Sequence, residues 1–370
     1  MKLFTVFDKI LAFRRRFRPR TAPPRGLLVV SSGGLGDTVL FSLVIEQFSR
    51  LAVDAEPVTL LVQKSSKMMG FLFPSGVHLK AIDFGRLRDL PYRRAVMDEL
   101  YDLNFRLVVH TDYLRHPHLD EAMIAAASAS ESVAMMARGW PKYDRALQAN
   151  SRMYDRLYDS GPRHLDKVRR WHQFAAWLNA AELPLPAFRI PPARLPAAAV
   201  EPAPLVIIQP FSAVREKQSA AALYRRIITS LPGGFNIAIA GTVNDRATNP
   251  EFEDIFALPN VTFDASTFED LTPRLLAARL VISVDTACMH LAAVIGAQTL
   301  CLASAAYVGE IVPYDAEMSP PNVLFLYHDM PCRGCLGNCS QPKEDGKFAC
   351  VARINADDAV AAVADMLDGN

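Results

Sequence analysis

Three stretches of the sequence place charged or hydroxyl side chains at spacings that suit group-transfer chemistry. The first is SSGGLGDTV (31–39), in which Asp37 follows Gly33, Gly34 and Gly36. Glycines allow a tight turn and a close approach by a substrate, and a carboxylate beside such a turn can take a proton from a hydroxyl as a general base. The same carboxylate also suits the first turn of a following helix, where the helix dipole stabilises it. The loop alone leaves both roles open.

The second stretch is IIQPFSAVREKQSAAAL (207–223), where an apolar run ends in a polar loop that holds Ser212, Arg215 and Lys217. Hydroxyl and ammonium groups on one loop can bind a phosphate through charge-assisted hydrogen bonds. Taken alone, the loop favours the simpler interpretation of an exposed segment with solvated charges.

The third stretch is LVISVDTACMHLAAVIGAQTL (280–300), where an apolar strand ends at Asp285 and Thr286 is placed to cap the next helix. The backbone N–H groups near Ala287 and Cys288 would then form an anion site at the positive end of the helix dipole. His290 falls on the first turn and can reach the same ligand. The alternative is a buried core histidine and an Asp285 that serves only as a cap.

Together the three stretches predict a base on one side and a diphosphate site on the other, the layout of a two-domain transferase that uses a nucleotide sugar. The glycines of residues 33–36 do not have the Gly-x-Gly-x-x-Gly spacing of a dinucleotide site, and no Gly-Lys-Ser/Thr follows them. A nicotinamide dehydrogenase is therefore disfavoured. No Asp-x-Asp motif points to a catalytic metal, so we expect no cofactor for catalysis.

Four late cysteines follow the spacing C-x2-C-x3-C-x10-C, at Cys332, Cys335, Cys339 and Cys350. In a reducing compartment such a cluster indicates a structural metal site before disulfides. Zinc suits four thiolates, and so does iron; the alternative is a set of reduced, unliganded thiols. Cys288 and Cys301 fit small buried apolar positions.

The elements that position these motifs alternate between strand and helix. We expect strands at 27–30, 58–62, 105–110, 205–210, 236–241, 280–284 and 299–303, and helices over 38–51, 166–183, about 220–231 and from 287. Such alternation predicts parallel sheets covered on both faces, with ligands bound beyond the carboxyl ends of the strands.

A proline-rich stretch at 183–204 marks the best domain boundary, because proline cannot continue either element. We therefore expect an N-terminal Rossmann-like domain over 26–190 and a linker over 191–204. A C-terminal domain follows over 205–370, with the cysteine-rich segment 332–350 and a final helix.

The first 25 residues form a separate basic leader in which apolar residues at helical spacing precede five arginines, Arg14, Arg15, Arg16, Arg18 and Arg20. Such a segment can lie on an anionic membrane surface; the alternatives are a disordered basic leader or a wrongly assigned start codon. The net charge of +1 argues against nucleic acid as a partner. No run of 18 or more apolar residues and no signal peptide is evident, so we expect a cytoplasmic protein, peripheral on the inner face of the inner membrane.

At these motifs the sequence resembles glycosyltransferase family 9, the heptosyltransferases of lipopolysaccharide assembly. SSGGLGDTVL resembles the family's Leu-Gly-Asp loop, and DTACMHLAA resembles its Asp-Thr-Gly-x-x-His-Leu motif, with Ala287 in place of glycine. QPFSAVREKQSA is similar in frame to the His-Pro-Gly loop, with Gln209 for histidine, Phe211 for glycine and no Trp-Pro after Lys217. IAGTVNDRA resembles the Gly-Gly-x-x-Glu segment through Gly241 and Asp245.

The resemblance implies a GT-B fold of the α/β class, in which two doubly wound Rossmann-like domains face each other across a cleft. It implies inverting, metal-independent transfer of a sugar, ADP-heptose being the expected donor and a lipopolysaccharide core or other lipid-linked or surface glycan the acceptor. Asp37 would be the base, while Lys217 and Asp285–Ala287 would hold the diphosphate. The departures leave two alternatives, a degenerate scaffold subunit of an envelope assembly complex and a nucleotide-sugar epimerase.

Overall fold

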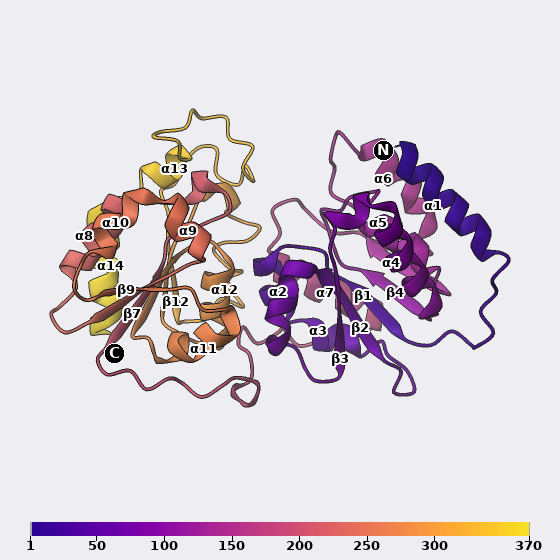
Figure 1. The fold of residues 1–370 in the computed structure, drawn as a ribbon, viewed down its shortest axis with the longest axis horizontal. Coiled ribbons are helices and arrows are strands. Elements are labelled where there is room, and N and C mark those ends of the chain that lie inside the picture. Colours follow the sequence, from indigo (N-terminus) through magenta and orange to yellow (C-terminus); the bar gives the residue numbers. More distant parts are fainter. Residues whose placement is uncertain (1, 370) are drawn as a thin grey trace. The chain divides into compact units, whose positions relative to one another are not determined.

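The computed structural model describes residues 2–369 and contains two compact units (Figure 1). Unit 1 comprises the chain up to Arg163 together with Val168–Pro184, and unit 2 comprises His164–Lys167 together with the chain from Leu185 onward. The main division thus falls at Pro184, at the start of the proline-rich stretch.

Unit 1 is built on a six-stranded parallel sheet with the order β3-β2-β1-β4-β5-β6. The strands are β1 (Leu27–Val30), β2 (Val58–Gln63), β3 (Val77–Ile82), β4 (Leu107–His110), β5 (Glu131–Met135) and β6 (Arg156–Tyr158). The helices are α1 (Lys2–Arg15), α2 (Leu35–Phe41), α3 (Ile45–Ser49), α4 (Leu90–Asp102), α5 (Asp120–Ala127), α6 (Asp144–Asn150) and α7 (Lys167–Asn179), with 3-10 turns η1 (Lys64–Leu72), η2 (Arg86–Arg88) and η3 (Ser151–Met153).

Unit 2 repeats this topology with the order β12-β11-β10-β7-β8-β9. Its strands are β7 (Leu205–Gln209), β8 (Asn236–Ala240), β9 (Val261–Asp264), β10 (Leu280–Val284), β11 (Thr299–Leu302) and β12 (Val323–Leu326). Its helices are α8 (Ala221–Ser230), α9 (Val243–Thr248), α10 (Glu253–Phe256), α11 (Phe268–Ala277), α12 (Ala287–Ile295), α13 (Ala349–Ala352) and α14 (Ala356–Asp368), with 3-10 turns η4 (Pro192–Arg194), η5 (Arg215–Lys217), η6 (Pro250–Phe252) and η7 (Ala305–Tyr307).

The central strands are apolar on both faces because helices cover both. In unit 1, Leu28 and Val30 pack with α4 and α5, while aromatic side chains from α2, α3 and α7 contact one another, as in the pair Phe41 and Trp171 with ring centroids 5.0 Å apart. In unit 2, alternate residues of β7 and β8 pack against α8 and α14. Each sheet is therefore a rigid support whose loops carry the polar motifs.

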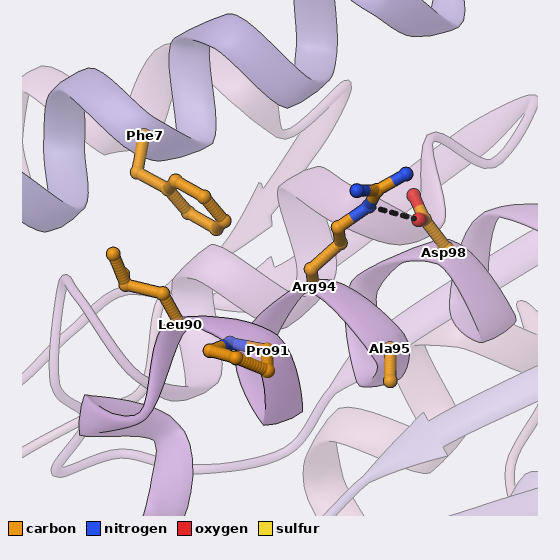
Figure 2. A pocket seen from close by; sticks show the side chains of 6 residues that line it. All are labelled: Phe7, Leu90, Pro91, Arg94, Ala95 and Asp98. Atoms are coloured by element: carbon orange, nitrogen blue, oxygen red, sulfur yellow. Dashed lines mark hydrogen bonds and ion pairs between the residues drawn. The ribbon is translucent and has the colours of Figure 1, made fainter.

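Helix α1 lies against α4 and α5 and belongs to unit 1 (Figure 1). Asp8 accepts two hydrogen bonds from the buried guanidinium of Arg93, at 2.7 and 2.6 Å, and Arg15 pairs with Asp98 at 3.2 Å. Between Asp8 and Arg15 in the sequence, Leu11 is buried and belongs to the apolar core of unit 1. A pocket of about 440 Å³ remains between α1 and the start of α4, lined by the residues drawn in Figure 2, Phe7, Leu90, Pro91, Arg94, Ala95 and Asp98.

Most predicted strands and helices are present, with one break and several additions. The helix predicted over 38–51 is two helices, because the Ser42 hydroxyl donates to the Val39 carbonyl and interrupts the ladder. Strands β3, β5, β6, β9 and β12 were not predicted from the sequence, since polar residues interrupt their apolar pattern or they span only three to five residues. None of the helices among residues 2–369 is both long and apolar enough to cross a bilayer.

Candidate functional site

The loop after β1 folds the Asp37 side chain back over its own glycines. Asp37 Oδ2 accepts a hydrogen bond from the Gly34 N–H at 3.1 Å. A Cβ atom on Gly33 would lie 2.4 Å from Asp37 Oδ2, whereas one on Gly34 would meet nothing within 4 Å. Gly33 is therefore required by the position of the carboxylate, which stays half-exposed in the first turn of α2.

The loops after β1 and β4 meet because these strands are neighbours in the sheet. The Ser32 N–H donates to Asp112 Oδ2 at 2.7 Å, and the Ser32 hydroxyl lies 3.4 Å from Asp120 Oδ2. In a doubly wound sheet this point, where the strand order reverses, is the usual ligand site. The sequence pattern placed the end of a strand at residue 110 but assigned no role to His110, Asp112 or Asp120.

His110 ends β4 and is fully buried beside these two carboxylates. Its Nδ1 atom is 2.8 Å from the Tyr154 hydroxyl, and its Nε2 atom is 3.5 Å from both Asp112 Oδ2 and Asp120 Oδ2. Burial alone would lower the pKa of His110, but Asp112 and Asp120 outweigh it and raise this pKa above its ordinary value. The signal available in the sequence was the triplet His-Thr-Asp at a strand end.

In unit 2 the equivalent point lies between β7 and β10, which are also neighbours. Lys217, in η5, places its Nζ atom 2.8 Å from Asp285 Oδ2 and donates to the Asp285 carbonyl at 2.7 Å. The ammonium also lies 4.4 Å from the centre of the Tyr307 ring. The structure thus brings together the lysine and the aspartate that the sequence analysis selected from separate motifs.

The start of α12 is fixed by Gln209, the last residue of β7. Gln209 Oε1 accepts hydrogen bonds from the Thr286 hydroxyl at 2.7 Å and from the Ser283 hydroxyl at 3.0 Å, and its amide donates to the Phe211 carbonyl at 2.6 Å. Thr286 occupies the N-cap position, but its side chain makes no capping bond to α12. The predicted side-chain cap is therefore wrong: the hydroxyl is used by Gln209 instead. Ala287 is the first residue of the helix.

His290 is buried and its ring is held on both sides. Its Nδ1 atom is 2.7 Å from the Tyr314 hydroxyl, and its Nε2 atom is 3.7 Å from Asp285 Oδ1. This geometry matches the alternative of a satisfied core histidine, and it also places the ring directly behind Asp285. His290 is positioned to orient the carboxylate that pairs with Lys217.

Three other predicted donor residues make local contacts. The Ser212 hydroxyl accepts from the Val214 N–H at 3.2 Å, and Asp245 Oδ2 accepts from the Thr242 N–H at 2.8 Å in a capping box at the start of α9. A Cβ on Gly241 would lie 2.7 Å from the Phe211 ring. Phe211 stands where the family motif has a glycine. Its ring fits beside residue 241 only because that residue is a glycine without a side chain.

The late cysteines gather between β12 and α13. Cys332 Sγ and Cys339 Sγ are 3.9 Å apart, and the Cys335 thiol also interacts with Cys339. Sulfur atoms on a tetrahedral metal with bonds of about 2.3 Å stand about 3.8 Å apart, so three of the thiols suit such a metal. Burial, followed by the neighbouring thiols, raises the pKa of Cys332, and burial raises that of Cys335.

The remaining cysteines differ from these three. Cys350 is buried, and its Sγ is 3.4 Å from the Ser304 hydroxyl. Cys288 and Cys301 lie in the apolar core, as predicted, and burial raises the pKa of Cys288 to about 12.

Comparison with known proteins finds similarity in structure but not in sequence. The sequence matches no family model and no curated protein. A glycosyltransferase family 9 structure from Veillonella parvula DSM 2008 matches with a TM-score of 0.70 and 14% identity, over 95% of this chain and 99% of that one. The E. coli heptosyltransferase WaaC with ADP matches with a TM-score of 0.65 and 14% identity, over 92% and 99%.

A more distant match is the iron-containing dodecameric glycosyltransferase TibC from enterotoxigenic E. coli H10407, with a TM-score of 0.52 and 15% identity over 95% of this chain and 78% of that one. At these identities the likeness is one of fold. The predicted α/β fold class and the resemblance to glycosyltransferase family 9 are confirmed at that level, since the chain has two parallel six-stranded sheets and these glycosyltransferase structures match it over 92–95% of its length.

Proposed function

We propose that the chain is an inverting glycosyltransferase that moves a sugar, heptose being the expected one, from a nucleotide diphosphate to a lipopolysaccharide core or another surface glycan. The observation that carries this proposal is the Lys217–Asp285 pair beside the first residue of α12. The likeness in fold to a family 9 glycosyltransferase and to a heptosyltransferase solved with ADP supports it.

On the donor side, the leaving diphosphate gains negative charge as the bond to the sugar breaks. Lys217 is 11% exposed and is held by Asp285 and Tyr307, so its ammonium needs little reorganisation to meet that charge. The N–H groups at the start of α12 add the positive end of a helix dipole. We assign to these groups the binding of the diphosphate and the stabilisation of its departure.

On the acceptor side, a hydroxyl must lose its proton as its oxygen attacks the anomeric carbon. Asp37 is the base in the proposed mechanism, because its half-exposed carboxylate is fixed by Gly34 N–H at the carboxyl edge of the sheet. The new carbon–oxygen bond forms as the bond to the diphosphate breaks, the proton passes to Asp37, and the nucleotide leaves with the electron pair. Attack opposite the leaving group inverts the anomeric carbon.

The test is a panel of nucleotide sugars, including ADP-heptose, with the wild type and Asp37→Asn. We expect at least one donor to raise the melting temperature of both proteins and Asp37→Asn to lose transfer by on the order of 10³-fold. Asp54→Asn is the matched control, because it removes an exposed carboxylate just before β2, at the other end of the strands. Transfer by Asp37→Asn at the normal rate would refute the base assignment.

The same panel separates the alternatives. A donor converted without any acceptor would identify an epimerase. No binding by any nucleotide sugar would favour a scaffold subunit, which the departures Gln209, Phe211 and Ala287 would then explain.

For the membrane, the outer face of α1 offers an apolar stripe opposite the face that docks on unit 1. Val6, Ile10 and Phe13 recur at helical spacing on α1 and are exposed, and Phe17, in the turn just after the helix, is 74% exposed. Lys9, Arg14 and Arg16 are also exposed, whereas Arg15 and Arg20 contact Asp98 and Tyr101 in unit 1. A stripe bordered by cations matches an anionic bilayer, so we propose that α1 binds the chain to such a surface.

Sedimentation with vesicles that contain anionic phospholipid tests the membrane proposal. Phe13→Ser with Phe17→Ser should reduce bound protein at least tenfold, because each phenylalanine contributes about 1.5–3 kcal/mol when buried. Val200→Ser with Val243→Ser removes two exposed valines of unit 2 and serves as the control. Equal binding by both double variants, or no binding by the wild type, would refute the proposal.

For the cysteine segment, we propose a structural zinc or iron ion held by Cys332, Cys335 and Cys339, with Cys350 nearby. The segment contacts the donor loop, since the Phe348 N–H donates to the Glu216 carbonyl at 3.0 Å and Lys343 pairs with the Glu216 carboxylate at 2.7 Å. Glu216 is the neighbour of Lys217 in η5. A metal here would stabilise the loop that holds the proposed diphosphate site.

A further inference from the structure

The carboxyl edge of the unit 1 sheet holds a buried group of one imidazole and two carboxylates. His110 is 0% exposed, Asp112 is 7% exposed and Asp120 is 2% exposed. Ionised carboxylates removed from water cost free energy unless a cation or hydrogen-bond donors compensate them. Each aspartate accepts one backbone N–H, Asp112 from Ser32 and Asp120 from His116, and the buried cation Arg115 is paired with Glu121 at 2.8 Å. Two carboxylates therefore share one imidazole in a buried place that a divalent cation would also suit.

His110 Nε2 points at both carboxylates without bonding to either. The two distances of 3.5 Å exceed the 2.7–3.2 Å range of N–H···O hydrogen bonds. Among the described residues, this buried nitrogen has no hydrogen-bond partner. Tyr154 fixes the ring through Nδ1. The Nε2 atom is therefore held between two carboxylate oxygens, too far from either to form a hydrogen bond.

The same spacing suits a metal ion. Nitrogen and oxygen ligands at about 2.0–2.2 Å from a tetrahedral ion stand about 3.3–3.6 Å apart, and here the three ligand atoms all lie within 4.8 Å of one another. We propose that His110 Nε2, Asp112 and Asp120 bind a divalent zinc-type cation, with the Ser32 hydroxyl or a water as fourth ligand. An imidazole donor favours zinc-type ions over magnesium or calcium, and two carboxylates neutralise the charge of +2.

Each ligand is oriented by a second contact, as metal ligands in proteins generally are. The Tyr154 hydroxyl contacts His110 Nδ1, which fixes Nε2 as the metal-binding nitrogen. The Ser32 N–H donates to Asp112 at 2.7 Å, and the His116 N–H donates to Asp120 Oδ1 at 2.7 Å. The ion would join the loop after β1, the end of β4 and the start of α5.

This site does not depend on the proposed transfer reaction. Its ligands are not residues to which we assign a catalytic role, and its link to the reaction runs only through Ser32, which lies in the same loop as Asp37. The ion would act as a clamp on the loop that carries the base.

The experiment is a cobalt and zinc titration of the full-length protein after treatment with chelator. Cysteines at 332, 335 and 339 are replaced by serine to remove the thiolate site. We expect this cysteine variant to bind about one equivalent of zinc with a raised melting temperature, and cobalt to give a visible spectrum without the thiolate charge-transfer band.

Asp112→Asn, Asp120→Asn and Tyr154→Phe are then added singly to the cysteine variant. The asparagine variants should lose the ion, and Tyr154→Phe should weaken it by about 10–100-fold. Asp155→Asn is the matched control, because Asp155 also accepts a serine N–H, at 2.8 Å from Ser132, and lies outside the cluster.

Absence of zinc and cobalt binding by the cysteine variant with an intact His110 cluster would overturn the proposal, and this measurement requires no substitution in the cluster itself. Retention of the ion by a folded Asp112→Asn variant would also overturn it.

Discussion

The two units have the same strand order, yet the points where that order reverses carry opposite chemistry. In unit 1 the loop after β1 carries Asp37, and its Ser32 contacts Asp112 and Asp120, which follow β4 on the same sheet edge. In unit 2 the loops after β7 and β10 place Lys217 beside Asp285 and the start of α12. Topology alone creates a ligand site at each point; the charges of the loop residues decide which ligand each one accepts.

The supports beneath the two sites differ as well. Under α12, neutral groups hold one another, with Gln209 accepting from Ser283 and Thr286. Beneath the unit 1 loop lie Asp112 and Asp120, which accept the Ser32 and His116 N–H groups and so occupy donors that a phosphate would need. The assignment of the donor to unit 2 and of the base to unit 1 therefore rests on these contacts as well as on sequence motifs.

The largest effect should follow from removing the cation of unit 2. We expect Lys217→Ala to lower kcat/KM by on the order of 100-fold or more and to weaken ADP binding measured by calorimetry, since a developing negative charge loses its nearest cation. Arg215→Ala is the control, because Arg215 belongs to the same 3-10 turn and its side chain is 59% exposed. An equal loss in both variants would mean that general charge, rather than the placed ammonium, binds the donor.

The second effect concerns the carboxylate of unit 1 and uses two adjacent glycines. Gly33→Ala would place a methyl group 2.4 Å from Asp37 Oδ2, whereas Gly34→Ala meets nothing within 4 Å. We expect Gly33→Ala to lower kcat by about 10–100-fold through displacement of the base, with unchanged ADP affinity. Gly34→Ala should remain close to the wild type in the same assay. Similar rates for both variants would contradict the assignment of Asp37 as the base.

Much of this arrangement could be predicted from the sequence because local signals and tertiary contacts agree. The apolar runs at 27–30 and 280–284 are the buried strands β1 and β10, and the polar residues that follow them lie at the sheet edges. Lys217 and Asp285 were selected from motifs 68 residues apart, and they meet because β7 and β10 are neighbours.

What could not be predicted depends on partners distant in the chain. The Thr286 hydroxyl donates to Gln209 and does not cap α12. This bond joins residues 77 positions apart, so no local pattern predicts it. The proximity of His110 to Asp120 across the β4–α5 loop has no periodic signature in the sequence. The sequence of the leader shows that its helix is amphipathic. Only the contacts of Asp8 with Arg93 and of Arg15 with Asp98 show which face packs on unit 1 and which stays exposed.

The third effect should separate the two sites through the cysteine segment. The hydrogen bonds and ion pairs described for this segment reach Glu216, Ala305 and Ala306, which all belong to unit 2. Cys332→Ser with Cys339→Ser removes two of the proposed metal ligands. Because the segment is bonded to Glu216 beside Lys217, we expect ADP binding to weaken by about three- to tenfold, which corresponds to about 0.7–1.4 kcal/mol.

The cysteine double variant should leave the unit 1 site unaffected. Gly33→Ala should therefore lower kcat by the same factor in this variant as in the wild type. Ser340→Ala is the control, since Ser340 is exposed, lies in the same segment and is not a proposed ligand. Unchanged metal content and ADP affinity in the ligand variant would contradict the structural role.

The smallest effect on turnover should come from Gly241→Ala. This variant tests whether Gly241, like Gly33, is needed at a ligand site or only for packing. Both glycines would clash with a side chain if a methyl group were added, but Gly33 faces Asp37 and Gly241 faces the Phe211 ring, at 2.7 Å. Phe211 is 2% exposed and packs on Phe252 with ring centroids 5.1 Å apart. The clash at Gly241 therefore falls in the core of unit 2 and not at its ligand site.

We accordingly expect Gly241→Ala to lower the free energy of unfolding by about 1–3 kcal/mol, the usual cost of overpacking a core, with kcat within a few-fold of the wild type. Phe211→Leu creates space beside Gly241, so the double variant should recover part of that loss in urea denaturation, a coupling that two contacting residues can show. If Gly241→Ala instead weakened ADP binding with unchanged stability, and Phe211→Leu gave no rescue, Gly241 would be a donor-site glycine. The two glycines would then have the same kind of role, one in each unit.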